Sequence, residues 1–213
     1  MTVYNDQLSQ YITDTFAVQD EALRRVYADT PRQGLPAISV KPEEGRFLQW
    51  MARACSARKA VEIGTLGGYS GIWIARGLLP GGTLITLERE PSHAAVAREH
   101  FQAAGLADRV EIRIGDARQS LRRLAAEGPF DFVFIDAEKA DYDAYWDWAL
   151  SNLRPGGIIA AHNAFRHGAI LDPGDRAAAT EAVRVFNRRV AAESRVISTI
   201  FPGGDGMLVA VKK

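Results

Sequence analysis

The sequence predicts an α/β protein built on a mostly parallel β-sheet with helices on both faces. From residue 59 onwards, short runs rich in β-branched and aromatic residues alternate with segments of helical periodicity. The predicted strands are residues 59–63, 83–87, 110–114, 130–135 and 157–161, and the predicted helices between them are residues 70–79, 91–104, 117–126 and 141–152. This alternation favours parallel strands joined by crossover helices, because such helices cover both faces of the sheet.

The amino-terminal part of the chain is predicted to be helical. Residues 3–29 carry apolar positions at helical spacing, residues 30–36 form a loop rich in proline and glycine, and another helix begins near Pro42. No break in composition marks a second domain. We therefore expect all 213 residues to form one domain, with an N-terminal helical cap over residues 1–57 and an α/β core over residues 58–213.

The carboxyl-terminal part predicts a β-hairpin. After a helix at residues 175–192, two β-rich runs at residues 196–200 and 207–211 flank a glycine-rich turn, so the last strand is expected to run antiparallel to its neighbour. Residues 154–157, Arg-Pro-Gly-Gly, are predicted to form a turn. Five β-α units closed by a hairpin match the Rossmann-like, seven-stranded sheet of S-adenosylmethionine (SAM) methyltransferases better than a dinucleotide dehydrogenase.

Charge and composition argue against several kinds of partner. Lys plus Arg and Asp plus Glu both number 26, so no overall field favours nucleic acid or an anionic membrane. Cys55 is the only cysteine, which excludes an internal disulfide or a site of several thiolates, and we expect it in the core. No apolar run is as long as a membrane span and the first residues are polar, so we expect a cytoplasmic protein.

The glycine-rich stretch at residues 62–70 carries the most functional information. It joins a short apolar run to a helical pattern, and this predicts a strand, a turn and a helix whose N-terminus meets a nucleotide-like ligand. Its glycines do not follow the G-x-G-x-x-G spacing of a dinucleotide turn, and an acidic residue precedes the first glycine by two positions, which favours SAM. The candidate cofactor-binding residues here are Glu62, Gly64, Gly68, Tyr69 and Ser70.

Acidic residues also stand at the ends of the other predicted strands. Glu88, Asp116 and Asp136 follow the second, third and fourth strands, at the edge where open α/β sheets bind ligands. Glu88 suits a ribose diol, Asp116 with the adjacent Ala117 suits adenine, and Ser70 can bind the methionine carboxylate. One such acid alone is more often a helix cap or a solvated loop residue. A series of them at one edge favours a cofactor site.

Taken together, these motifs resemble the cation-dependent O-methyltransferases, a family that includes catechol and caffeoyl-CoA O-methyltransferases and many bacterial relatives. The resemblance is carried by residues 62–70, 136–139 and 204–206, and it extends from about residue 36 to the end of the chain, including residues 42–48. It implies a SAM-dependent O-methyltransferase that acts on a small ortho-dihydroxy aromatic acceptor, uses a divalent cation and forms a homodimer.

The resemblance also implies roles for single residues. Asp136 and Asn163 match two of the family's ligands for the divalent cation. Lys139 matches the lysine that serves as general base, and Tyr142 falls where the family often carries an aromatic beside the substrate. From spacing alone, Lys139 would instead be a solvated surface lysine.

One position departs from the family pattern, because His162 stands where the family has a second Asp. Magnesium prefers oxygen ligands, whereas imidazole suits Mn, Fe, Co, Ni or Zn. Three interpretations follow. His162 ligates a transition metal with Asp136 and Asn163, or it is a catalytic base or substrate donor in a site whose cation is weak or absent, or it fills a site that has decayed.

The remaining polar candidates have simpler expected positions. His93 and His100 fall in a predicted surface helix. The long connection at residues 164–175 is expected to influence the choice of acceptor, and within it Arg166 is either a partner for an acidic acceptor or a solvated loop residue.

Three other enzymatic functions and one non-enzymatic function compete with the small-aromatic methyltransferase. One is a tRNA hydroxyuridine-type O-methyltransferase, which the balanced charge disfavours. Another is a metal-independent small-molecule methyltransferase that uses His162 as its base. The third is an NAD-linked oxidoreductase, disfavoured by the glycine spacing; a SAM-binding protein without catalysis is the non-enzymatic alternative.

Overall fold

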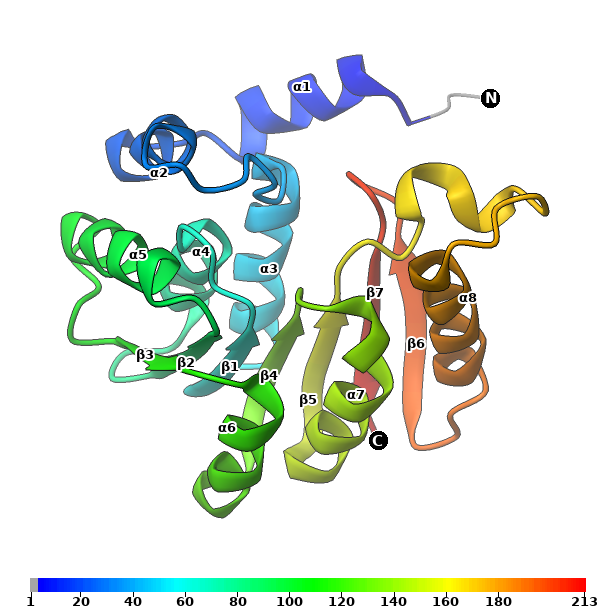
Figure 1. The fold of residues 1–213 in the computed structure, drawn as a ribbon. Helices are drawn as coiled ribbons and strands as arrows, with labels where there is room; N and C mark the ends of the chain where they lie inside the picture. The colour runs from blue at the N-terminus through cyan, green and yellow to red at the C-terminus, as the bar shows by residue number, and fades with distance from the viewer. Residues whose placement is uncertain (1–3) are drawn as a thin grey trace.

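A seven-stranded sheet of order β3-β2-β1-β4-β5-β7-β6 forms the centre of this computed structural model, which describes residues 4–213 (Figure 1). The strands are β1 Lys59–Ile63, β2 Thr83–Glu88, β3 Val110–Ile114, β4 Phe130–Ile135, β5 Leu153–Ala161, β6 Val196–Phe201 and β7 Met207–Lys212. The first five strands are parallel, while β7 runs antiparallel to both β5 and β6. The predicted fold class is confirmed.

Within residues 4–213, eight α-helices accompany this sheet. They are α1 Asp6–Phe16, α2 Glu21–Arg32, α3 Pro42–Ala54, α4 Tyr69–Gly77, α5 Pro91–Ala103, α6 Ala117–Leu124, α7 Tyr142–Asn152 and α8 Ala178–Ala191. Helices α3, α4 and α5 cover one face of the sheet, and α6, α7 and α8 cover the other (Figure 1). None of the helices described in residues 4–213 has the length and apolar character needed to cross a membrane.

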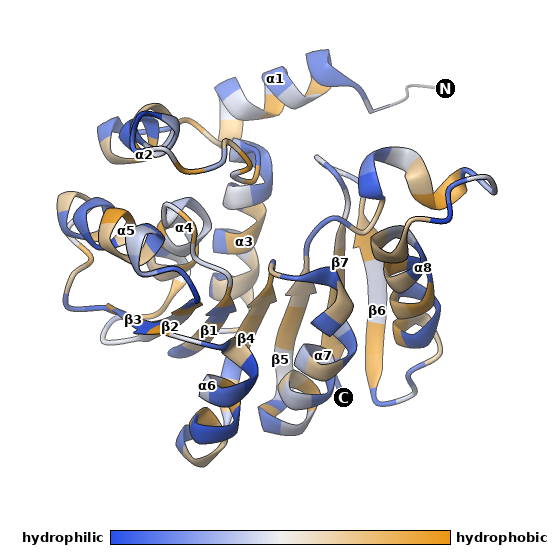
Figure 2. Ribbon diagram, in the orientation of Figure 1, coloured by the Kyte–Doolittle hydropathy of each residue, from blue (hydrophilic) through white to orange (hydrophobic). Residues whose placement is uncertain are grey.

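Alternation along the strands supplies a separate hydrophobic core to each face. In β1, Ala60 packs with α3 and α4, whereas Val61 and Ile63 pack with the helices of the opposite face. Both faces of the central strands are therefore apolar, and Figure 2 shows these strands as the hydrophobic centre of the ribbon. Glu62 points to the same face as Ala60 and is fully buried there.

The N-terminal cap consists of two helices before α3 rather than one continuous helix. The prediction of a helix over residues 3–29 was wrong in this respect, and its first residue lies outside the described part of the chain. The break has a local cause, because the Asp20 side chain accepts a hydrogen bond from the Leu23 N–H (3.1 Å) and begins α2. Helix α2 then continues to Arg32, into the segment predicted to be a loop.

The predicted turn at residues 154–157 forms part of β5. Leu153 pairs with Phe130 of β4, and the next paired residue is Ile158, opposite Phe132. The four intervening residues bulge out of the ladder, with Gly156 at φ +73°. The proline and glycines therefore mark a bulge within a strand instead of its start.

Candidate active site

A cavity of about 940 Å³ lies at the carboxyl ends of the parallel strands. This volume is within the usual range for small-molecule sites. The sequence-predicted site residues that line it are Gly64, Tyr69, Ser70, Glu88, Asp116, Ala117, Asp136, Lys139, His162 and Asn163. The fold thus brings together residues from five strand ends, while Glu62 and Gly68 do not line the cavity.

The glycine turn has the tight backbone that its sequence predicts. Gly64 has φ +99°, and a side chain there would overlap the backbone carbonyl of Asp136. Gly68 lies in the left-handed region as well and begins α4, where the Tyr69 hydroxyl donates to Gln19 Oε1 (3.0 Å). Tyr69 and Ser70 line the cavity, so the N-terminus of α4 adjoins it, and a helix N-terminus suits an anionic ligand group.

Glu62 lies behind this turn. Its carboxylate accepts hydrogen bonds from the Ser70 hydroxyl (2.6 Å) and the Thr86 hydroxyl (2.7 Å). Burial raises the pKa of Glu62 to about 7, although both hydroxyl bonds oppose the rise. The contacts make Glu62 a support for Ser70 and β2 in this structure.

Glu88 and Asp116 line the cavity near the ends of β2 and β3. Glu88 Oε2 accepts from the backbone N–H groups of Thr65 (3.2 Å) and Leu66 (2.8 Å), so its carboxylate is held in place by the glycine turn. Asp116 caps α6 by accepting from the Gln119 N–H (2.8 Å). The capping role and a position in the cavity are thus compatible for the same side chain.

Asp136, Lys139 and Tyr142 form a connected group at the end of β4. Lys139 Nζ lies 3.1 Å from Asp136 Oδ1 and donates to the Tyr142 hydroxyl oxygen (2.7 Å). Tyr142 is buried, and its hydroxyl in turn donates to the backbone carbonyl of His162 (3.2 Å). Lys139 is therefore not a solvated surface lysine, since only 13% of its side chain is exposed.

His162, at the end of β5, lies between two carboxylates. Its Nδ1 is 3.2 Å from Asp136 Oδ2, and its Nε2 is 2.9 Å from Glu44 Oε1. Burial disfavours a charged ring, but the two carboxylates outweigh it and hold the pKa of His162 well above its usual value. For Asp136, burial is likewise outweighed, and His162 with Lys139 keeps its pKa below the usual range.

The loop of the C-terminal hairpin closes the cavity next to Asn163. Asn163, which has φ +58°, donates from Nδ2 to Asp205 Oδ2 (2.8 Å). Gly204 has φ +57°, and a side chain there would overlap the Glu44 carboxylate. Gly204 of the Gly-Asp-Gly motif thus leaves room for the Glu44 side chain, and Asp205 orients the Asn163 amide.

The three side chains predicted to ligate a metal do not offer a free donor set. Both ring nitrogens of His162 face carboxylates, and both Asp136 oxygens already contact cationic side chains. The Asn163 amide is oriented by Asp205. Within residues 4–213, no group of three or more His, Cys, Asp or Glu side chains is arranged to hold a metal ion. This arrangement does not fit a divalent cation.

Two residues of structural importance escaped the sequence analysis. Glu44 is buried in the first turn of α3 and contacts His162, 118 positions away, so only the fold reveals the pair.

His100 was expected at the surface, and this was wrong. It shares a helical face with the buried Ala97 and Phe101, and its Nδ1 lies 2.7 Å from the Gly67 carbonyl oxygen of the glycine turn. The spacing of the apolar residues Ala94, Ala97 and Phe101 on one face of the helix is the sequence signal that could have placed it there.

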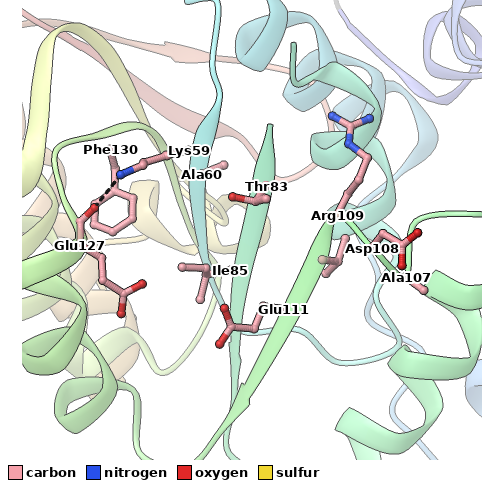
Figure 3. A pocket seen from close by; sticks show the side chains of 11 residues that line it. Lys59, Ala60, Thr83, Ile85, Ala107, Asp108, Arg109, Glu111, Glu127 and Phe130 are labelled. Carbon is pink, nitrogen blue, oxygen red and sulfur yellow. Dashed lines mark hydrogen bonds between the residues drawn. The ribbon is translucent and has the colours of Figure 1, made fainter. Parts of the chain in front are cut away.

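A second hollow, of about 450 Å³, opens where strands β1 to β3 begin, at the opposite edge of the sheet (Figure 3). Two of its basic residues donate hydrogen bonds within the chain. Lys59 Nζ donates to the Glu127 carbonyl (3.0 Å), and the Arg109 guanidinium donates to carbonyl oxygens that include Gly82 O (3.1 Å). No sequence-predicted site residue lines this hollow.

The fold and this cavity define a SAM-type methyltransferase, and the chain belongs to the O-methyltransferase family, whose model matches residues 13–213. A catechol O-methyltransferase from Niastella koreensis is 43% identical over 98% of this chain and 97% of its own length. Another from Mycobacterium tuberculosis is 42% identical over 94% of this chain and 93% of its own length.

A solved structure gives the same picture. The O-methyltransferase from Bacillus cereus in complex with SAH superposes with a TM-score of 0.90 at 42% identity, over 97% of each chain. SAH is the compound that SAM becomes when it loses its methyl group. The predictions of the family and of a SAM-dependent O-methyltransferase are thereby confirmed.

Proposed function

We propose that this O-methyltransferase moves the methyl group of SAM to one hydroxyl of a small, catechol-like ortho-dihydroxy aromatic acceptor. The observation that carries the proposal is a single cavity that joins Glu88 and Asp116 on one side to Lys139 on the other. The names of the two relatives from N. koreensis and M. tuberculosis support the acceptor class. A cytoplasmic location stays a proposal that rests on the sequence alone.

The cofactor occupies the side of the cavity next to the glycine turn in this proposal. Glu88 accepts hydrogen bonds from the ribose hydroxyls, and its fixed carboxylate supports that role. Asp116 and Ala117 adjoin the adenine. The N-terminus of α4, with Ser70 in its first turn, receives the methionine carboxylate.

The methyl transfer itself is an in-line displacement. The acceptor oxygen attacks the methyl carbon while the carbon–sulfur bond breaks, and sulfur keeps the bonding electrons and loses its positive charge. The hydroxyl proton passes to Lys139 Nζ, so atoms and charge balance. Alignment of the two bound partners lowers the barrier by up to roughly 7–11 kcal/mol in favourable systems.

His162 is not the base in this proposal, because neither of its ring nitrogens faces the open cavity without a carboxylate partner. No step passes through a divalent cation either, since Asp136, His162 and Asn163 do not fit one in their present contacts. Lys139 is therefore the side chain that accepts the proton in this proposal.

We also propose a homodimer formed through one apolar face, here called the α3–β6 face, which consists of Phe47, Trp50, Ile197, Phe201 and Val211. Trp50 is 61% exposed and Ile197 is 69% exposed, and neighbouring Val211 is exposed as well. Phe47 stacks between Trp50 and Phe201, with ring centroids 5.9 and 4.2 Å away. The face is therefore continuous, and burial in a second copy would stabilise it.

The acceptor class is tested by following methyl transfer from SAM to catechol, to a matched monophenol and to tRNA that carries hydroxyuridine. We expect methylation of catechol and little of the other two. If SAM binds and no catechol is methylated, the acceptor class is wrong and hydroxylated nucleosides take its place.

The role of Lys139 gives a sharper test. Lys139→Met removes the proton acceptor, and we expect kcat to fall by about 10²–10⁴-fold while SAM binding is retained. Lys139→Arg is the matched control, since it keeps a cation beside Asp136 but cannot accept a proton at neutral pH. Full activity of the Arg variant would show that only the charge is needed.

A further inference from the structure

The imidazole of His162 is held at its two ends by carboxylates from different parts of the fold. Glu44 comes from the first turn of α3 and Asp136 from the end of β4. Each carboxylate has a second anchor, because Glu44 Oε2 accepts from the Lys41 N–H (2.8 Å) and Asp136 Oδ1 contacts Lys139 Nζ (3.1 Å). With only 7% of His162 exposed, its ring has a defined position.

The bonding of the ring determines what His162 can offer a ligand. An ionised carboxylate only accepts hydrogen bonds, so each ring nitrogen that faces one carries a proton and donates it. A metal ion needs the lone pair of a neutral imidazole. In this arrangement each ring nitrogen of His162 already has a carboxylate partner, so neither is free to ligate a metal ion.

The donor atoms of the cluster are already engaged without a metal. Asp136 Oδ1 contacts Lys139 Nζ, Asp136 Oδ2 contacts His162 Nδ1, and Glu44 Oε1 contacts His162 Nε2. A metal ion bound here would have to displace one or more of these partly buried contacts, which is unfavourable.

We propose that the Glu44–His162–Asp136 bridge takes the place of a divalent cation, so that methyl transfer proceeds without one. Glu44 is a positioning residue in this arrangement, because it touches His162 and does not act on the acceptor. The inference rests on the proposed function only for its activity readout.

The first experiment compares the wild-type enzyme after chelator treatment with the same enzyme given Mg²⁺, Mn²⁺ or Zn²⁺. We expect the rate of catechol methylation to change little in any of these conditions. His162→Asp recreates a carboxylate beside Asn163, and this variant is expected to lose activity roughly 100-fold after chelation and to regain it with Mg²⁺. A wild-type enzyme that fails after chelation and recovers with a metal overturns the proposal.

A second measurement does not depend on the acceptor. Calorimetric titration with Mg²⁺, Mn²⁺ and Zn²⁺ is expected to detect no site in the wild-type protein and one Mg²⁺ site in His162→Asp. Stoichiometric binding of any of these ions to the wild-type cluster overturns the proposal, even if the His162→Asp variant does not fold. Because no acceptor is present, a wrong acceptor class leaves this result intact.

The protonation of the ring can be observed directly by ¹⁵N NMR of the histidine side chains. We expect both His162 nitrogens to be protonated at neutral pH in the wild-type protein. In Glu44→Gln the signal is expected to shift towards neutral imidazole, and kcat to fall about tenfold with the KM for SAM unchanged. A neutral ring in the wild-type protein, or unaltered kcat and imidazole signals in the variant, contradicts the assigned role of Glu44.

Discussion

Glu62 illustrates how a buried carboxylate can serve a binding site that it does not enter. Two hydroxyl groups donate to it, and one of them belongs to Ser70, which lines the cavity. Each hydrogen bond to a charged group stabilises the fold by about 1.5–3 kcal/mol. Glu62 thereby fixes the first turn of α4, although burial of its own charged carboxylate is unfavourable.

Because burial disfavours the charged form of Glu62, the stability of the fold depends on pH. The pKa of Glu62 is raised to about 7 in the fold, above its value in the unfolded chain, so the folded state binds more protons between about pH 4.5 and 7. The free energy of unfolding should therefore fall as pH rises through this window, by up to about 3 kcal/mol. Glu62→Gln, which does not titrate, should lack this slope.

Denaturant unfolding of the cofactor-free protein at several pH values from 5 to 8 measures the effect. The unfolding free energy of Glu62→Gln minus that of wild type should increase as pH rises, because only the wild-type value falls. Glu99→Gln, at an exposed position on α5, is the control and should follow the wild-type profile. Parallel profiles for wild type and Glu62→Gln would contradict the prediction.

At the scale of elements, α1 is attached to the rest of the molecule mainly through polar contacts. The side chains of Tyr4, Ser9 and Thr13 all donate to the Glu43 carboxylate, which is 3% exposed. The larger apolar side chains of α1 include exposed Tyr11. An element held by few apolar contacts opens more readily than the core.

Ser9→Ala should therefore loosen α1 without affecting the sheet. Loss of a hydrogen bond to a buried carboxylate costs about 1.5–3 kcal/mol, so hydrogen exchange in residues 6–16 should accelerate by roughly ten- to a hundredfold. Gln10→Ala, which removes only an exposed contact with Asp14 in the same helix, is the matched control. Equal exchange in the two variants would show that Glu43 does not hold the helix.

Most elements could be predicted because their signals are local. The strands at 59–63, 110–114 and 130–135 have the predicted bounds, since each is an apolar or β-branched run between turn residues. The bulge at 154–157 could not be predicted, because a proline and two glycines signal a turn equally well inside a strand or before it. The boundary of the cap at residue 57 stays a prediction.

At the scale of the whole molecule, the sheet order explains which parts of the site the sequence could supply. Strand ends of a parallel sheet share one edge, so Glu88, Asp116 and Asp136 could be grouped before their contacts were known. The Glu44–His162 contact joins α3 to β5 and has no local signal. The resemblance assigned His162 a position, but only packing determines its partners.

The proposed assembly is tested at this same scale. Ile197→Glu places a charge in the α3–β6 face and should convert a dimer into a monomer, because burial of an unpaired charge is unfavourable. Light scattering coupled to gel filtration should give twice the 23.3 kDa chain mass for wild type and the chain mass for the variant. Val185→Glu, on the outer surface of α8, is the control and should remain dimeric. A monomeric wild-type protein rules the assembly out.

The strand order β5-β7-β6 has a consequence for how the chain acquires its activity during synthesis. On the ribosome β6 emerges before β7, yet among the described strands β6 pairs only with β7, so it remains unpaired until the later strand appears. The loop between them supplies Gly204 and Asp205, against which Glu44 and Asn163 are placed. A nascent chain could therefore form the cofactor side first and become competent for methyl transfer only after β7 has inserted.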